Sequence, residues 1–327
     1  MDGESRFRRL APAIGLIFLS PLVGEFLLGS SPIQYLPYAL VLLVPLYGGG
    51  ALLIRELARR SGRGYPTVVL LGAAYGVIEA GLLDQSMFNP DFLEPANGGK
   101  SPASPLAVSV NNALGYVTGH AVWSIVIPVA FIELMAPPEK SESPWLGKVG
   151  LAASAVLYLT GCAIVFSFIY AEHRFLASPA QLAGAAAAAV VLIFLAFKAG
   201  TENGGPRQDG GKELKPRLLG TGSFLASGGF VSRPENWAGF AAGIILLIAA
   251  WFLLRRWSRR SWWSKRHRFA LVSGALMTYA WLGFVVTHML WPDDRIAWFG
   301  NALFASAAIA LIAWISRRVK RDEKRKI

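Results

Sequence analysis

The sequence has little cysteine and little charge. Cys162 is the single cysteine among 327 residues, so no disulfide can form within the chain and no site can be built from several thiolates. Charged residues make up 16% of the chain, whereas a soluble domain has about 25%. The HExxH, GxSxG, Walker A and CxxC motifs are also absent. These absences exclude a disulfide scaffold and the soluble enzymes that depend on those motifs.

Long apolar runs fill most of the chain instead. Hydrophobic residues make up 54% of it, and the mean hydropathy is +0.44. A run of about 20 apolar residues is long enough to cross a bilayer, and its backbone must then be helical. The sequence therefore predicts an all-α, polytopic transmembrane helical bundle. Its nine apolar segments cover roughly residues 11–30, 36–57, 66–88, 105–135, 146–170, 178–199, 235–256, 267–290 and 297–316.

Basic residues lie between and after these segments. The net charge is +12, from 32 basic and 20 acidic residues, with dense clusters at 255–268 and 317–326. Clusters of Lys and Arg beside apolar segments are typical of cytoplasmic flanks. We therefore expect a multi-pass plasma-membrane protein, of bacterial type, with both termini in the cytoplasm. The partners indicated are the lipid bilayer and anionic lipids at the basic segments, not nucleic acid.

Nine crossings would conflict with this orientation, because they place the basic C-terminus outside. The Gly- and Ser-rich stretch 216–233 is modestly apolar and short for a span. A short or re-entrant crossing there would restore the agreement. The alternative is that part of 105–135 only dips into the membrane. Either way the number of crossings is predicted to be even, eight or ten.

A polar, Gly-rich stretch at 200–216 divides the chain. We expect a six-segment membrane part at 1–199, a linker with the short segment at 200–234, a three-segment part at 235–316 and a basic tail at 317–327. Pro45 and Pro128 fall inside apolar segments, where they predict kinks.

Ionisable residues inside an apolar segment cost about 2.5–3.5 kcal/mol each at the centre of a bilayer, so each needs an explanation. Glu25, Glu79 and Asp84 lie well inside such segments, and no Lys or Arg lies at mid-segment to neutralise Glu79 or Asp84. The remaining partners are His120, His288, a metal ion or a proton on the carboxyl group. Glu56 and Glu133 lie near segment ends, where pairing such as Arg55 with Glu56 is sufficient.

Helical periodicity places these residues on particular faces. Glu79 shares a face with Gly72, Tyr75, Gly76 and Ser86, and the glycines there let another helix approach closely. Tyr116 and Ser124 share a face with His120. Packing alone could also explain the polar residues, so this alternative stays open, above all for Asp84 and Glu25.

One ordering of residues resembles a known family. Glu79, then Tyr116 four residues before His120, then His288 in a late segment resemble the Glu-Glu-xxx-Arg, Phe-xxx-His and His-xxx-Asn/Asp motifs of the CAAX prenyl protease and bacteriocin-immunity (CPBP) intramembrane proteases. The resemblance implies a hydrolase in which Glu79 activates water. It also implies that His120 and His288, with Glu79, hold a divalent metal such as zinc or stabilise an oxyanion.

Two other functions remain open. A transporter would use Glu79, with Asp84 or Glu25, as a proton or cation relay along a wet path to both faces. A non-catalytic scaffold or immunity-type protein would keep its polar residues dispersed and locally satisfied. The mutual positions of Glu79, His120 and His288 distinguish these hypotheses.

Overall fold

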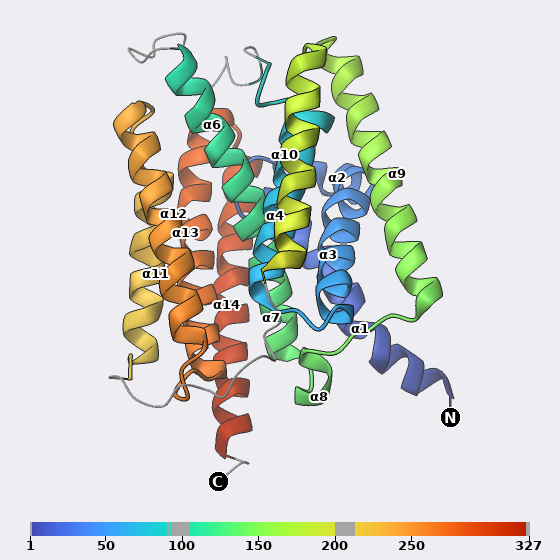
Figure 1. Ribbon diagram of the computed structural model, residues 1–327, viewed down its shortest axis with the longest axis vertical. Helices are drawn as coiled ribbons and strands as arrows, with labels where there is room; N and C mark the ends of the chain where they lie inside the picture. The colour runs from blue at the N-terminus through green and yellow to red at the C-terminus, as the bar shows by residue number, and fades with distance from the viewer. Residues whose placement is uncertain (1, 90–91, 93–104, 200–212, 325–327) are drawn as a thin grey trace.

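The computed structural model describes residues 2–89, 92, 105–199 and 213–324 (Figure 1). Every regular element in those residues is helical, which confirms the all-α prediction. The α-helices are α1 Asp2–Pro21, α2 Leu36–Leu43, α3 Gly49–Arg60, α4 Tyr65–Ile78, α6 Pro105–Gly119, α7 Ile127–Met135, α8 Pro138–Ser141, α9 Lys148–His173, α10 Pro179–Lys198, α11 Pro216–Val231, α12 Trp237–Ser258, α13 Lys265–Leu290 and α14 Arg295–Lys324. Four π-helical turns continue them, η1 Leu22–Phe26, η3 Val44–Gly48, η4 Glu79–Leu83 and η6 His120–Val126, and η2 Ile33–Tyr35 is a 3₁₀ turn.

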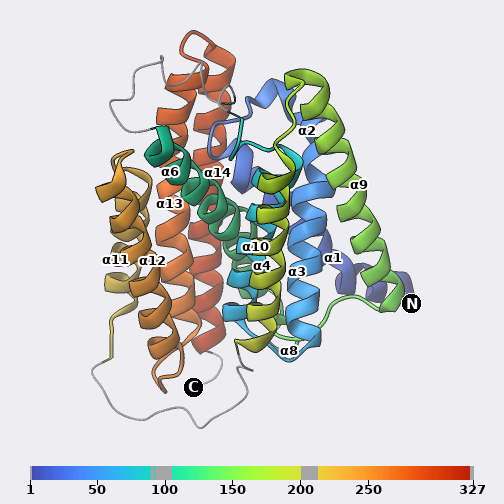
Figure 2. The same ribbon diagram turned by 45° about the horizontal axis from the view of Figure 1, so that its top comes forward.

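Within the part of the chain that the structure describes, eight helical segments are long and apolar enough to cross a membrane. A shorter apolar helix covers Leu10–Phe26, and α11 lies beside α13, so ten helical segments form the bundle. With 16 residues, α11 is about 24 Å long, somewhat less than the roughly 30 Å of a bilayer core. Both termini lie at the same end of the bundle (Figures 1 and 2). This arrangement agrees with the even number of crossings expected from the basic residues.

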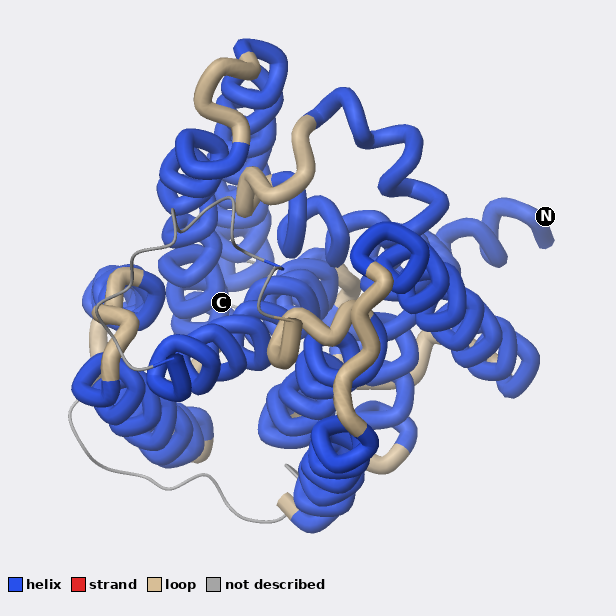
Figure 3. The backbone as a smooth tube through the Cα atoms, turned by 90° about the horizontal axis from the view of Figure 1, so that it is seen from above, coloured by secondary structure: helices blue, strands red, loops and turns tan. Residues whose placement is uncertain are grey.

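The middle of the bundle is formed by α4 and by the continuous rod α6–η6–α7 (Figure 1). Figure 3 shows the same bundle from above, with its helices and loops. In the most apolar part of Ser109–Met135, 72% of the residues are buried, against 11% in Lys148–His173 and in Trp237–Ser258. A helix that is apolar all round but little buried presents most of its surface to lipid. The central helices are therefore the ones that can hold a protected polar site.

Three of the four π-helical turns adjoin a proline. Pro21 directly precedes η1, Pro45 lies inside η3, and Pro128 follows η6 by two residues. Proline lacks an N–H and clashes with the preceding turn, so the backbone around it must depart from regular α-helix. The departures predicted at Pro45 and Pro128 are thus present as widened turns.

The segments before and after residue 200 share a hydrophobic core. The indole of Trp123 in η6 stacks on the ring of Tyr279 in α13, with centroids 4.3 Å apart. Its Nε1–H donates to the carbonyl of Ala275 at 2.8 Å. The predicted boundary between two membrane parts stays a prediction, and α14 continues as a helix through the first residues of the expected basic tail.

Candidate functional site

Five side chains form a polar cluster in the centre of the bundle. They are Glu25 of η1, Tyr47 of η3, Tyr75 of α4, Glu79 of η4 and His120 of η6; we call them the intramembrane cluster. Four of the five lie in π-helical turns. Such turns are rare and often mark functional positions, because they redirect side chains from the regular helical face.

Glu79 and His120 are in direct contact in the cluster, at an angle that is not that of a hydrogen bond. Nδ1 of His120 lies 3.0 Å from Oε2 of Glu79, and the side chains are 14% and 5% exposed. Glycines make this approach possible: a Cβ at Gly76 would lie 2.9 Å from the backbone of Val117, and one at Gly72 would lie 3.2 Å from that of Ala121. The predicted glycine face of α4 therefore packs on α6 and η6.

Glu25 forms a second pair within the cluster. The hydroxyl of Tyr47 donates a short hydrogen bond to Oε1 of Glu25, and the hydroxyl of Ser30 donates to Oε2 at 2.6 Å. Both carboxylate oxygens therefore have a donor. Gly24 lets η1 pack here, since a Cβ on it would lie 2.6 Å from Oγ of Ser124.

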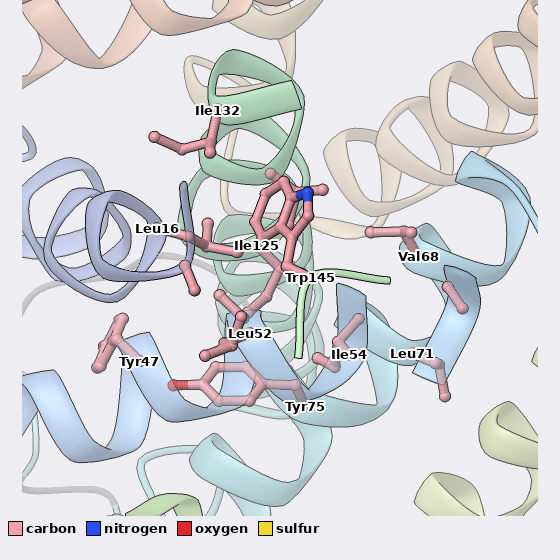
Figure 4. Close-up of a cluster of buried hydrophobic side chains, with 14 of the residues drawn as sticks. Leu16, Tyr47, Leu52, Ile54, Val68, Leu71, Tyr75, Ile125, Ile132 and Trp145 are labelled. Carbon is pink, nitrogen blue, oxygen red and sulfur yellow. The ribbon is translucent and has the colours of Figure 1, made fainter. Parts of the chain in front are cut away.

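Aromatic rings connect the two pairs. The ring of His120 lies 5.8 Å from that of Tyr47 and 6.1 Å from that of Tyr75, and the two tyrosine rings are 6.0 Å apart. Figure 4 shows the Tyr75 hydroxyl directed toward Tyr47. Tyr158 of α9 continues this wall at 6.0 Å from Tyr75. The imidazole thus faces a carboxylate on one side and phenol rings on others.

The position of the cluster along the bundle follows from the helix rise. Glu79 is 14 residues along the rod that starts at Tyr65, which corresponds to about 21 Å of helix rise. Because that rod starts at the end that holds the termini, the cluster lies beyond the middle, toward the opposite end (Figure 1).

His288, the third member of the expected site, lies elsewhere. It is exposed on α13, and its ring is 6.2 Å from that of Trp298. Within the described residues, no group of three or more His, Cys, Asp and Glu side chains is placed to hold a metal ion. The zinc-type site expected from Glu79, His120 and His288 is therefore not formed.

The other polar residues singled out in the sequence have local roles. Oδ1 of Asp84 accepts from the backbone N–H of Ser86 at 2.9 Å, which closes the turn after η4. The carbonyl of Ser124 accepts from the hydroxyl of Ser20 at 2.6 Å and ties η6 to α1. The ring of Tyr116 contacts that of Phe92 at 6.4 Å, one helical turn above His120.

A second set of buried charges lies near the opposite end of α4. Both oxygens of Glu133 are paired with Arg59, at 2.8 and 2.7 Å. Tyr65 and Arg55 also donate to Glu133, at 2.7 and 3.1 Å. The predicted pairing of Arg55 with Glu56 is confirmed at 2.8 Å. Because each carboxylate here has several donors, this arginine cluster fits a structural clamp between α3 and α7.

Tyr47 and Tyr75 are the members of the cluster that the sequence did not indicate as candidates. Neither carries a formal charge, and tyrosine is common in apolar helices at the membrane boundary. For Tyr75 the nearest signal was its place on the same helical face as Glu79. For Tyr47 it was the adjoining Gly48–Gly50 run beside Pro45, where Gly50 packs against the ring of Tyr75.

The fold and the buried polar cluster together define a polytopic, all-α membrane protein with ionisable groups held inside its bundle. The chain belongs to an uncharacterized membrane protein family, whose model matches residues 15–320. No curated protein and no solved structure matches the chain.

Proposed function

We propose that this protein is an intramembrane hydrolase in which Glu79 and His120 activate a water molecule. The observation that carries the proposal is their contact, 3.0 Å from Oε2 to Nδ1, inside the membrane. Ionisable pairs are expensive at that depth, and those found there commonly serve a function.

The pair has the arrangement of a general base and the group that orients it. A carboxylate facing Nδ1 favours the tautomer with the proton on Nδ1, so Nε2 can accept a proton from water. The water oxygen then attacks an electrophilic carbonyl carbon. The protonated imidazole returns the proton to the leaving group as the bond to it breaks, and the Glu79 carboxylate stabilises the imidazolium in between.

The resemblance to the CPBP proteases points to the same class of reaction, with Glu79 and His120 in the matching order. The proposal departs from that family at His288, which is exposed beside Trp298. In its place, Glu25 and Tyr47 provide a second acidic group next to the imidazole. Neither the proposed reaction nor its site requires His288.

The charge distribution supports one orientation. The turn between α3 and α4 and both termini lie at the same end of the bundle, and that turn is flanked by Arg59, Arg60 and Arg63. By the positive-inside rule this end faces the cytoplasm. The cluster then lies in the outer half of the membrane.

The test uses the purified protein in lipid nanodiscs, incubated with a bacterial lipid extract and, separately, with prenylated peptides. Mass spectrometry follows the appearance of cleaved products. We expect Glu79→Gln and His120→Ala each to lower the rate by roughly 10²–10⁴-fold, the usual contribution of a general base. His288→Ala is the matched control and should keep full activity. Product release that persists unchanged in Glu79→Gln would overturn the proposal.

A second candidate is a proton relay, because Glu25 and Tyr47 continue the row of protonatable groups beyond His120. It predicts proton flux in proteoliposomes loaded with a pH-sensitive dye and loss of that flux in both Glu25→Gln and Glu79→Gln. Flux without any hydrolysis would favour the relay over the hydrolase.

A further inference from the structure

A polar pocket lies between α6 and the turn that joins α11 to α12. Its volume is about 210 Å³, and its walls carry Asn111, Asn112, Tyr116, Arg233 and Glu235. The turn lies at the end of the bundle opposite the two termini (Figure 1). In a membrane, lipid headgroups occupy this level.

Arg233 is fixed in this pocket before any ligand arrives. Its Nη1 donates to the carbonyl of Phe230 at 2.7 Å, and Nη2 donates to the carbonyl of Asn111 at 2.7 Å. Nε donates to Oδ1 of Asn111 at 3.3 Å, and the guanidinium lies 4.2 Å from the centre of the Phe230 ring. A guanidinium has five N–H donors, so these bonds leave two of them for a ligand. Rigid placement of a donor pair is what phosphate recognition by arginine requires.

Two further features suit the pocket to an amphiphile. The buried hydroxyl of Tyr116 has no hydrogen-bond partner among the described residues. Glu235 is exposed at the rim, where it disfavours a second negative charge and favours an amine. A headgroup with one phosphate and one amine would match these groups: Arg233 and the Tyr116 hydroxyl can donate to the phosphate, and Glu235 can accept from the amine.

Two residues that line the pocket share one face of α6 with His120 of the intramembrane cluster. Asn112, Tyr116 and His120 are spaced by four residues, so they form a single stripe that runs inward. His120 lies about 6 Å of helix rise below Tyr116 and about 12 Å below Asn112. A lipid whose headgroup occupies the pocket would extend its deeper part along this face, in the direction of the Glu79–His120 pair.

From these observations we propose that the pocket binds the zwitterionic phosphate-and-amine headgroup of a phospholipid, with Arg233 on the phosphate and Glu235 near the amine. This proposal rests on the proposed function in one respect: it makes such a lipid, or a conjugate that carries the same headgroup, the substrate class of the Glu79–His120 pair. The binding itself does not require any hydrolysis.

Native mass spectrometry of the full-length protein with added phosphatidylethanolamine tests the binding. We expect Arg233→Gln to weaken retention of this lipid at least tenfold relative to the wild type. Arg174→Gln is the matched control, because Arg174 is an exposed arginine at the turn before α10, at the same end of the bundle. Arg233→Lys keeps the charge but loses the two-pronged set of donors, so its lipid retention should lie between those of the wild type and Arg233→Gln. If Arg233→Gln does not fold, the comparison of Arg233→Lys with the wild type tests the proposal.

Three results of the retention experiment would count against the proposal. Equal retention by the wild type, Arg233→Gln and Arg233→Lys would overturn the proposal. Binding of inorganic phosphate that needs Arg233, with lipid retention unchanged by its loss, would also overturn it in favour of a free phosphate. Stronger retention of phosphatidylglycerol than of phosphatidylethanolamine would contradict the role of Glu235.

A further comparison distinguishes failure of the lipid-binding proposal from failure of the proposed hydrolase function. Glu79→Gln should retain the lipid as the wild type does. Lipid retention that needs Arg233, together with no hydrolysis by any variant, would leave the pocket in place and overturn the proposed function. Hydrolysis that does not depend on Arg233 would leave the proposed function in place and overturn the assignment of the bound lipid as its substrate.

Discussion

Glu79 and His120 depend on each other, because their side chains are in contact in an apolar surrounding. Removal of one leaves the other as a buried polar group without its partner, which is more costly inside a bundle than in water. This dependence can be measured without knowledge of any substrate.

A double-mutant cycle with Glu79→Gln and His120→Ala should give a coupling free energy of about 0.5–3 kcal/mol, the range for residues in direct contact. Unfolding in mixed micelles provides the measurement. The same cycle with Glu79→Gln and His288→Ala is the control and should show coupling near zero. Equal coupling in the two cycles would mean that the Glu79–His120 contact contributes nothing specific.

Glu133 should be the most sensitive acid for stability. Glu133→Gln removes the negative charge that pairs with Arg55 and Arg59. Breaking a buried ion pair typically costs about 3–5 kcal/mol. Glu142→Gln is the comparison: Glu142 is paired at 3.4 Å with Arg268, its side chain is 60% exposed, and such a pair contributes about 0–1 kcal/mol. Thermal unfolding of both variants in the same detergent measures which one loses more stability. A larger loss of stability in Glu142→Gln than in Glu133→Gln would contradict the prediction.

At the scale of the helix, close contacts rather than apolar surface fix the cluster. Gly76→Ala would place a Cβ 2.9 Å from the backbone of Val117 and 3.3 Å from Cβ of His120. We expect a loss of about 1–3 kcal/mol, the usual cost of overpacking, together with a loss of any activity of the pair. Gly184→Ala on α10 has open space around the new methyl group and should be neutral or slightly stabilising. If the two alanine variants behave alike, close packing of α4 on α6 is not what positions His120.

The start of α14 should respond to pH through Asp294, which lies between the spans. Its carboxylate accepts from the backbone N–H groups of Ala297 and Ile296 and from Gln34, and these bonds hold its pKa below the ordinary 3.8. A lowered pKa means that the stabilisation is present above about pH 4 and is lost as the pH falls through the folded-state value. Asp294→Ala should therefore lower the melting temperature more at pH 6 than at pH 3. A larger effect of Asp294→Ala at pH 3 than at pH 6 would refute the assignment.

The sequence predicted the helices well and the cluster only in part. Apolar length located the spans, and Pro45 and Pro128 located irregular turns, because both signals act locally. Glu79 and His120 were recognised as costly, but their contact depends on which helices are neighbours. Periodicity within one helix does not contain that information, and for the same reason Glu25 could not be joined to Tyr47. His288 was misplaced because its order along the chain says nothing about its distance from the other two.

At the scale of the whole molecule, α11 decides the orientation of everything after it. If α11 crosses the membrane, the turns that hold Ser61 and Ser258 share one face and Ser232 lies on the other. Single cysteines at these positions in a Cys162→Ala background should separate accordingly: an impermeant maleimide should label residue 232 in intact cells, and 61 and 258 only after permeabilisation. Labelling of 61 and 258 on opposite faces would mean that α11 does not cross.

The π-helical turns have a consequence for how such a protein can change through insertions and deletions. A π turn holds one more residue than an α turn of the same kind, so deletion of a single residue from η6 could leave an unbroken α-helix. The extra residue is accommodated within the turn, so α7 would keep its rotation and its neighbours. The side chains of η6, which starts at His120, would instead shift by one position relative to Glu79, although none had been replaced. One residue of backbone length can thus separate a bundle that holds this polar pair from one that does not, and a comparison of substitutions alone would overlook the difference.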